Sequence, residues 1–328
     1  MNVDEIRRIA VIGAGLMGHG IAQELVLAGY DVRLHDVDAE KLEQAVDNMR
    51  ANLRTLAELG LVTAAQVAAI PTAIRTSTVL ADVAADADLA IEAVFENLAL
   101  KHDVFRQLDR LCPPHAILAS NTSSFMPSTL ATVTGRQDKM LVAHYFNPPH
   151  LIPLVEVVPG AATAAETVDT IVALLVRVGK QPVIVRKEAP GFIGNRLQAA
   201  LRREALSIVA QGIATPQDVD TVVKTSFGRR LAVAGPFEIS ELNGLDLTLA
   251  IAEQLFPTLE SSPEVPAVLR DKVIRGELGA KTGKGFYEWT PEAVSALRQR
   301  IGRALIEITG WSRAGRDRGL AEGLPNDA

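Results

Sequence analysis

The sequence predicts a two-domain α/β protein, with a doubly wound parallel sheet in the first domain and a smaller, all-α second domain. Short apolar, β-branched runs alternate with helical spacing in the first part of the chain, which is typical of a parallel sheet covered by helices. The chain has 328 residues, enough for two domains. The strand pattern all but disappears after Pro190–Gly191. We therefore expect domains at 1–187 and 188–310, with a frayed tail at 311–328.

The composition argues against several classes of protein. Apolar residues make up 48% of the chain, so disorder is not expected. The formal net charge is −6 and there is no basic block, which argues against a nucleic-acid partner. The single cysteine cannot form an internal disulfide, and no apolar run approaches the roughly 20 residues of a membrane helix. The N-terminus does not resemble a signal peptide. We expect a soluble cytoplasmic protein with no membrane association.

A glycine-rich loop follows the first predicted strand, Arg8–Ile12, and opens a helix. In the pattern G-x-G-x-x-G, the first glycine allows a tight turn, the second lets the backbone approach a pyrophosphate, and the third lets helix and strand pack closely. Free N–H groups and the helix dipole then hold the phosphates. The residues expected to contact a dinucleotide are Gly13, Gly15, Leu16, Met17 and Gly18.

An acidic residue, Asp36, ends the second predicted strand about 20 residues after the loop, the distance expected for a dinucleotide site. Its carboxylate would accept hydrogen bonds from the adenosine ribose. Because Val37 and Asp38 follow it, and no arginine is there to bind a 2′-phosphate, NAD is favoured over NADP. The alternative is a glycine-rich turn in some other α/β protein.

Two short apolar runs, Met140 to Ala143 and Leu154 to Val158, flank a proline-rich loop in the stretch that leads from His144 to Gly160. If the loop folds the chain back on itself, His144 and Glu156 face one another. A carboxylate beside a histidine fixes its tautomer and stabilises the imidazolium, as proton transfer requires. The alternative is that His144 merely ends a buried strand and Glu156 is a charge at the rim.

Several motifs resemble the 3-hydroxyacyl-CoA dehydrogenase family over nearly the whole chain. They are H-Y-F-N-P with a glutamate twelve positions on, A-V-F-E-N-L-A-L-K, S-N-T-S-S, P-G-F-I-G-N-R and K-T-G-K-G-F-Y. The resemblance implies NAD-dependent oxidation of a 3-hydroxyacyl substrate in fatty acid metabolism. It implies that His144 is the general base and Glu156 its partner. It also implies a homodimer formed mainly by residues after Pro190.

The same resemblance assigns further site residues. Glu96 and Lys101 would approach the nicotinamide end of the cofactor, whereas by itself Glu96 is an acid that favours a helix N-terminus. Asn121 and Ser123 would face cofactor and substrate, although a serine-rich run is also a common helix cap. Asn195 would donate to the substrate oxygen.

Two departures from the family pattern leave the substrate open. The segment 51–76 is poor in lysine, where acyl-CoA members are rich in it. In addition, Arg230 precedes an apolar residue and alanine ahead of the G-P-F-E segment, which is similar to gulonate and carnitine dehydrogenases and would suit a free carboxylate. An arginine there is also compatible with a solvated surface.

Two other functions compete with dehydrogenation of a 3-hydroxyacyl group. The β-hydroxyacid dehydrogenases related to 6-phosphogluconate dehydrogenase use a lysine four positions after an asparagine, and here that position is Ala199. A protein that binds NAD without turnover would be expected to have lost the histidine–glutamate pair, and both residues are present.

Overall fold

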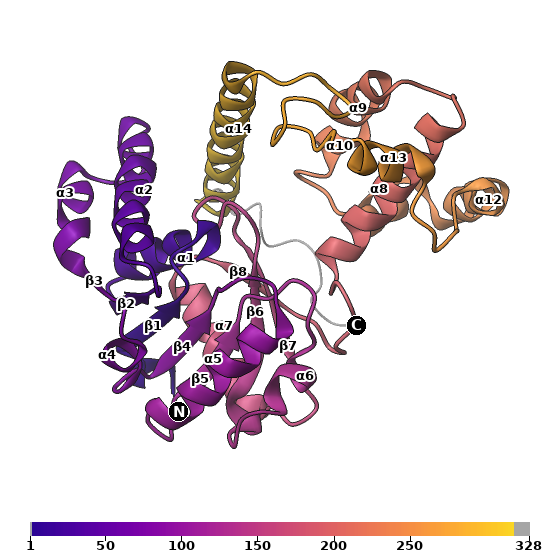
Figure 1. The fold of residues 1–328 in the computed structure, drawn as a ribbon. Coiled ribbons are helices and arrows are strands. Elements are labelled where there is room, and N and C mark those ends of the chain that lie inside the picture. The colour runs from indigo at the N-terminus through magenta and orange to yellow at the C-terminus, as the bar shows by residue number, and fades with distance from the viewer. Residues whose placement is uncertain (1, 318–328) are drawn as a thin grey trace. The chain divides into compact units, whose positions relative to one another are not determined.

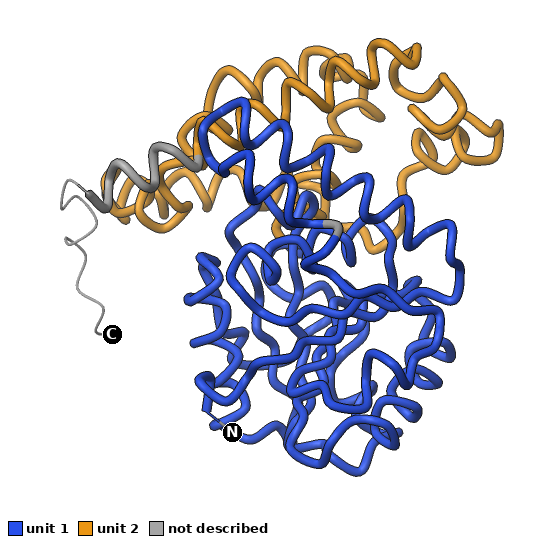
Figure 2. The backbone as a smooth tube through the Cα atoms, turned by 90° about the vertical axis from the view of Figure 1, so that its left-hand side faces the viewer, with its two compact units in different colours: residues 1–196 blue, residues 197–328 orange. Residues whose placement is uncertain are grey.

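The computed structural model describes residues 2–317. It divides into two compact units, residues 1–196 and 197–328 (Figures 1 and 2). The division lies nine residues beyond the boundary expected after residue 187. The N–H groups of Ile193 and Gly194 bind a carboxylate in the sheet, which holds this segment to the first unit.

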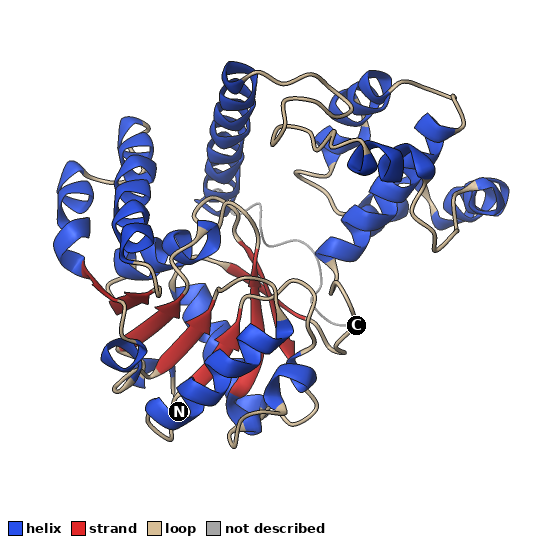
Figure 3. Ribbon diagram, in the orientation of Figure 1, coloured by secondary structure: helices blue, strands red, loops and turns tan. Residues whose placement is uncertain are grey.

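The first unit is built on one eight-stranded sheet, in the order β3-β2-β1-β4-β5-β6-β7-β8 (Figure 3). Its order reverses around β1, which is the doubly wound arrangement predicted from the sequence. All neighbours are parallel except β6 and β7, which are antiparallel. The strands are β1 Arg8–Ile12, β2 Asp31–His35, β3 Ile74–Ser77, β4 Leu89–Glu92, β5 Ile117–Ser120, β6 Met140–Tyr145, β7 Leu154–Pro159 and β8 Gln181–Ile184.

The central strands are buried on both faces, because helices cover the sheet on either side. Every residue of β4, β5 and β6 is buried. This explains why their sequences are mostly apolar, since a strand with two covered faces has no solvent side to make polar, and the exceptions are Glu92, Ser120 and His144 near the carboxyl ends. The helices of the first unit are α1 Leu16–Leu27, α2 Ala39–Glu58, α3 Ala64–Ala73, α4 Leu80–Ala84, α5 Leu98–Leu111, α6 Pro127–Ala131 and α7 Ala165–Arg177.

One strand, β3, was not predicted from the sequence. It pairs with β2 at the edge of the sheet, and two of its four residues are exposed. Its sequence, I-R-T-S, has neither the apolar run of a central strand nor a clear alternation, so local pattern gave no signal. Pairing with β2 specifies it instead.

The second unit is helical, as predicted, and it has little core of its own. Within residues 197–308, Ser207 is the one buried residue. The segment from Pro236 to Leu255 forms two helices, because Gly244 adopts a φ of 92° and ends the first of them. The helices are α8 Gly194–Ala210, which begins in the first unit, α9 Pro216–Thr225, α10 Phe227–Arg230, α11 Pro236–Asn243, α12 Leu245–Leu255, α13 Ala267–Ile274 and α14 Pro291–Asp317.

Helix α14 extends further than expected. The sequence predicted a frayed tail from residue 311, but the helix continues to Asp317. The remaining tail, residues 318–328, lies outside the described residues. Across the described chain, no helix combines the length and apolar character that crossing a bilayer requires.

Candidate active site

The glycine-rich loop between β1 and α1 has the geometry of a phosphate-binding turn. Gly13 has a φ of 104°, and a Cβ there would lie 2.6 Å from the carbonyl oxygen of Ala93. A Cβ on Gly18 would lie 1.7 Å from the carbonyl oxygen of Gly13. Gly15 differs, because a Cβ there would meet no protein atom within 4 Å. The space over Gly15, at the N-terminus of α1, fits a pyrophosphate.

Asp36 connects the end of β2 to this loop. Its Oδ2 accepts a hydrogen bond from the N–H of Ala14 at 2.9 Å, and its Oδ1 accepts one from the N–H of Asp38. Apolar side chains beside these residues are exposed, among them Val37 at 83% and Phe95 at 75%. A loop of glycines, an acid and exposed apolar side chains at the carboxyl ends of β1, β2 and β4 together fit an adenine dinucleotide.

The strands β6 and β7 bring His144 and Glu156 together. They are paired in the antiparallel register, and His144 Nδ1 lies 2.8 Å from Glu156 Oε2. Both side chains are buried. With Nδ1–H donated to the carboxylate, Nε2 is left as the basic nitrogen. It makes no hydrogen bond with the described part of the chain.

The second oxygen of Glu156 is held by the start of α8. Its Oε1 accepts hydrogen bonds from the N–H groups of Ile193 at 2.9 Å and Gly194 at 2.8 Å. Burial opposes ionisation, but the hydrogen bonds from His144 and these two N–H groups prevail and lower the pKa of Glu156. Glu156 is therefore an anion with both oxygens occupied, fixed in place beside the histidine.

Two aromatic rings enclose the imidazole. Phe146 and Phe192 have ring centroids 4.6 Å and 5.6 Å from that of His144. Phe192 has a φ of 49°, which is rare for a residue with a side chain. A Cβ on Gly194 would lie 2.5 Å from Phe146 Cζ, so this position accommodates glycine alone without a shift of the ring.

The dinucleotide-binding geometry and the paired histidine and glutamate agree with the comparison to known families. The NAD-binding domain of 3-hydroxyacyl-CoA dehydrogenase matches residues 8–189, and the C-terminal domain of the same family matches residues 191–289. The chain belongs to the 3-hydroxyacyl-CoA dehydrogenase family. This 3-hydroxyacyl-CoA dehydrogenase homologue is accordingly an NAD-dependent oxidoreductase acting on a CH–OH group.

Some relatives in the family are named for CoA thioester substrates and others for a free carboxylate. The chain is 40% identical over 87% of its length to a probable 3-hydroxybutyryl-CoA dehydrogenase of Bacillus subtilis, of which it covers 98%. It is 36% identical over 92% of its length to 5-formyl-3-hydroxy-2-methylpyridine 4-carboxylate 5-dehydrogenase of Mesorhizobium japonicum, of which it covers 97%. A crystal structure of an enzyme with that second activity superposes with a TM-score of 0.87 over 93% of this chain and 97% of the other, at 35% identity.

A structure of (S)-3-hydroxybutyryl-CoA dehydrogenase from Ralstonia eutropha superposes with a TM-score of 0.72, at 35% identity over 87% of this chain and all of the other. Both family domain matches end before α14 begins at Pro291.

The loop after β5 lies beside the end of β6 and carries two of the predicted site residues. Ser120 pairs with Val142 in the parallel register. Asn121 follows, and its Oδ1 accepts a hydrogen bond from the N–H of Tyr145 at 2.9 Å. This bond ties the loop that carries Ser123 to the residue after His144. Ser123 itself is partly exposed.

Glu96 and Lys101 occupy a polar cluster beneath the same loop. The side chain of Glu96 is partly exposed, at 38%, whereas that of Lys101 is 1% exposed. The Lys101 ammonium donates to Glu92 Oε1 at 2.7 Å and lies 3.1 Å from Glu96 Oε2. The predicted contact of both residues with the cofactor stays a prediction. In the structure the ammonium of Lys101 is occupied by two carboxylates.

A second buried lysine, Lys180, holds the loop between β6 and β7. Its ammonium donates to the carbonyl oxygens of Pro149 and Ile152 and forms an ion pair with Glu24 on α1. Burial raises the pKa of Glu24 to about 7, against the attraction of Lys180. Burial, followed by the positive charge of neighbouring groups, lowers the pKa of His150 to about 4.

The other predicted residues are placed as follows. Asn195 lies in the first turn of α8, directly after the N–H groups that hold Glu156. Arg230 lies on α10 in the second unit and is exposed.

Sequence reasoning missed the N–H groups of residues 193 and 194 and the buried Glu92. The first belong to the P-G-F-I-G-N-R motif, whose glycines indicated a turn. Glu92 is an acid at the end of an otherwise apolar strand, a signal that was available.

Proposed function

We propose that the enzyme oxidises the hydroxyl at C3 of a 3-hydroxyacyl substrate to a ketone. The observation that supports this most directly is the buried His144–Glu156 pair, with Nδ1 2.8 Å from the carboxylate and Nε2 free of protein partners among the described residues. NAD, when bound, accepts the hydride. His144 Nε2 takes the hydroxyl proton, and the fixed carboxylate of Glu156 stabilises the imidazolium that forms.

Ser123 and Asn195 are proposed to bind the oxygen that becomes the carbonyl. Hydrogen-bond donors aimed at an oxygen that gains negative character in the transition state stabilise it more than they stabilise the bound alcohol. The positions support this. Asn195 follows the N–H groups that bind Glu156, and Ser123 follows Asn121, which is bonded to the backbone after His144.

The cofactor is proposed to contact the glycine loop, with Asp36 binding the adenosine ribose. Asn121 and the partly exposed Glu96 would face its nicotinamide end. The proposal rests on the open space over Gly15 and on the carboxyl ends of β1, β4 and β5, which the register aligns at one edge of the sheet. Ligands of doubly wound sheets bind at that edge.

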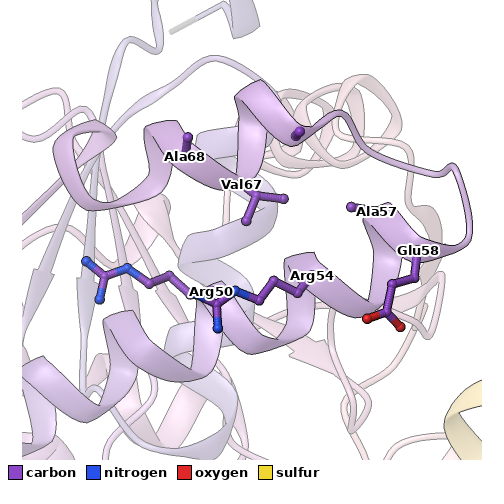
Figure 4. Close-up of a pocket in the computed structure, with 7 residues that line it drawn as sticks. Arg50, Arg54, Ala57, Glu58, Val67 and Ala68 are labelled. Atoms are coloured by element: carbon purple, nitrogen blue, oxygen red, sulfur yellow. The ribbon is translucent and has the colours of Figure 1, made fainter.

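A free hydroxy acid is the second candidate substrate, and two observations favour it. The enzyme with a TM-score of 0.87 is named for a pyridine carboxylate, not a thioester. In addition, the hollow between α2 and α3, of about 490 Å³, has no lysine in its lining, which consists of three alanines, a valine, two arginines and a glutamate (Figure 4). Of the two arginines that line it, Arg50 is already paired with Asp47. Arg230 would then meet the carboxylate.

Turnover measurements separate the two substrates. Reduction of acetoacetyl-CoA by NADH and oxidation of a panel of free 3-hydroxy acids by NAD are followed at the NADH absorbance. We expect acetoacetyl-CoA to be the better substrate. A free acid with a higher kcat/KM would replace the first candidate by the second, and no turnover with either class would refute the proposed function.

We also propose a homodimer formed mainly by the second unit. Among residues 197–308 only Ser207 is buried, and apolar side chains such as Phe237 and Leu242 are 84% exposed. Helices with so little core of their own need another surface to cover their apolar faces. A second copy of the chain supplies that surface through a symmetric interface.

A further inference from the structure

A lysine is buried between two carboxylates at the carboxyl end of β4. Glu92 is 0% exposed and Lys101 1% exposed, and their charged atoms are 2.7 Å apart. The same ammonium lies 3.1 Å from Glu96 Oε2 and donates to the carbonyl oxygen of Val94 at 3.4 Å. One cation on α5 therefore fixes two anions, one on the last residue of β4 and one on the segment that follows it.

Each of these carboxylates holds one end of the loop that follows β5. Glu92 Oε2 accepts a hydrogen bond from the hydroxyl of Ser120 at 2.5 Å. Glu96 Oε1 accepts hydrogen bonds from the hydroxyls of Thr122 and Ser124, each at 2.5 Å, and from the N–H groups of Ser123 and Ser124 at 3.2 and 3.1 Å. The loop is thus fixed by hydrogen bonds on both sides of Asn121.

Stability alone gives a poor account of a buried ion pair in this place. Removing two charges from water costs more than their attraction commonly returns, and well-packed apolar residues of the same size are often as stable. Charged groups in a fixed network are better suited to hold other polar groups in one geometry. Glu96 needs such support, because burial alone would disfavour its charge, and its hydrogen bonds with Ser124, Thr122 and Lys101 lower its pKa.

We propose that Glu92 and Lys101 are positioning residues for dehydrogenation. Through Glu96 they hold the 120–124 loop so that Ser123 meets the substrate oxygen. In this role Lys101 acts through Glu96. The role of Ser123 in this inference rests on the proposed function, whereas the grip on the loop does not.

The test compares Lys101→Met, Glu92→Gln and the double variant with a matched control, Arg136→Met. Arg136 pairs with Asp109, which lies toward the other end of α5, and it also binds backbone carbonyl oxygens. Hydrogen–deuterium exchange of residues 120–126 is measured without substrate, beside kcat, KM and NADH affinity. Lys101→Met should raise amide exchange of Ser123 and Ser124 and lower kcat, each by about tenfold, with NADH affinity within about twofold. The control should change neither.

The double variant separates positioning from folding. It leaves no unpaired buried charge, so it should regain most of the thermal stability that Lys101→Met loses. Its kcat should stay low, because Glu96 still lacks its cation. Recovery of kcat together with stability would overturn the proposal.

The last experiment repeats the Lys101→Met substitution in a Ser123→Ala variant. In that background Lys101→Met should lower kcat by less than about twofold, since the group being positioned is absent. An undiminished loss, a fall in NADH affinity with unchanged exchange, or raised exchange with normal kcat would each overturn the proposal. If the unmodified protein turns over no 3-hydroxy substrate, the proposed function fails. The positioning of the loop is tested separately, because unchanged amide exchange in Lys101→Met would refute it whatever the substrate.

Discussion

The two units of this enzyme differ in how they bury their apolar side chains. In the first, β4, β5 and β6 are buried at every residue and helices cover both faces of the sheet. In the second, helices present apolar faces to solvent, and Ser207 is the one buried residue between 197 and 308. The first unit can hold charged groups at fixed positions because a packed core surrounds them. The second is better suited to associate with another surface.

The largest expected effect comes from the first unit. General-base catalysis contributes about 10²–10⁴ in rate, so His144→Gln should lower kcat by that factor. NAD affinity, which depends on the glycine loop, should stay within about twofold, and so should the dimer dissociation constant. Steady-state kinetics and fluorescence titration with NADH measure these quantities. Near-normal turnover would refute the mechanism.

Glu156→Gln tests whether the histidine acts with its partner. It keeps the shape of the side chain but removes the charge, and it should lower kcat by about 10²-fold. The double variant should be little worse than His144→Gln alone, because the two residues act as a unit. Losses that simply multiply would show that they act independently.

The next largest effect concerns the cofactor. A hydrogen bond to a charged group is worth roughly 1.5–3 kcal/mol, so Asp36→Ala should weaken NAD binding by about ten- to a hundredfold. Because Asp36 also binds the N–H of Ala14, part of the loss comes from the loop. Isothermal titration with NAD and NADP measures the change. Use of NADP equal to that of NAD by the unmodified protein would contradict the assignment.

A change in the second unit should affect assembly and spare the cofactor. Phe237→Asp on α11 places a charge on an apolar face and should raise the dimer dissociation constant by about tenfold or more. Light scattering at micromolar concentration measures it, with Glu241→Gln on the same helix as the control. A monomeric unmodified protein would refute the dimer. A large loss of NAD affinity in the variant would show that the second unit also affects cofactor binding, contrary to the expectation.

The last prediction concerns the stability of the first unit, which should depend on pH, and it is expected to affect turnover least. The pKa of His150 is about 4 in the fold against 6.5 for a free histidine, so the unfolded chain binds the proton first as pH falls. The stability that neutral His150 contributes is present above pH 6.5 and is lost between pH 6.5 and 4. Each pKa unit corresponds to about 1.4 kcal/mol, so the shift from 6.5 to about 4 corresponds to about 3.5 kcal/mol in all.

Glu24 has the opposite sign. Its pKa of about 7 exceeds the 4.5 of a free glutamate, so its contribution is present below pH 4.5 and is lost as pH rises to 7. The test compares the free energy of unfolding, measured with urea at pH 4.5 and 7.0, in His150→Gln and in the unmodified protein. Because the variant lacks the imidazole, its free energy of unfolding at pH 4.5 should be higher relative to that at pH 7.0 than in the unmodified protein. An equal change in the free energy of unfolding in both proteins would mean that groups other than His150 determine the stability at acidic pH.

Much of the fold was predictable because local pattern and tertiary structure agree in the first unit. The runs ending at Ile12 and Ser120 are mostly apolar, and those strands are almost entirely buried. β3 and the break at Gly244 were not predicted, since one depends on pairing with a neighbour and the other on a backbone conformation within a helical pattern. The extension of α14 to Asp317 was missed because its polar residues resemble a tail.

The candidate site was predictable only in part. Spacing predicted that His144 and Glu156 face one another, and the register pairs them. The support for that pair comes from elsewhere in the chain, through the N–H groups of residues 193 and 194, and no spacing rule links those to position 156. The partners of Lys101 were likewise hidden, because they depend on how α5 packs against β4.

The structure restricts two glycines of one motif for different reasons. A Cβ at Gly18 would collide with the backbone of Gly13, whereas one at Gly15 would meet no protein atom within 4 Å. Gly18 is therefore constrained by the fold in every descendant of this chain, but Gly15 only while a ligand must come close to it. A lineage that gave up the cofactor would be free to vary the second glycine and would still have to keep the third.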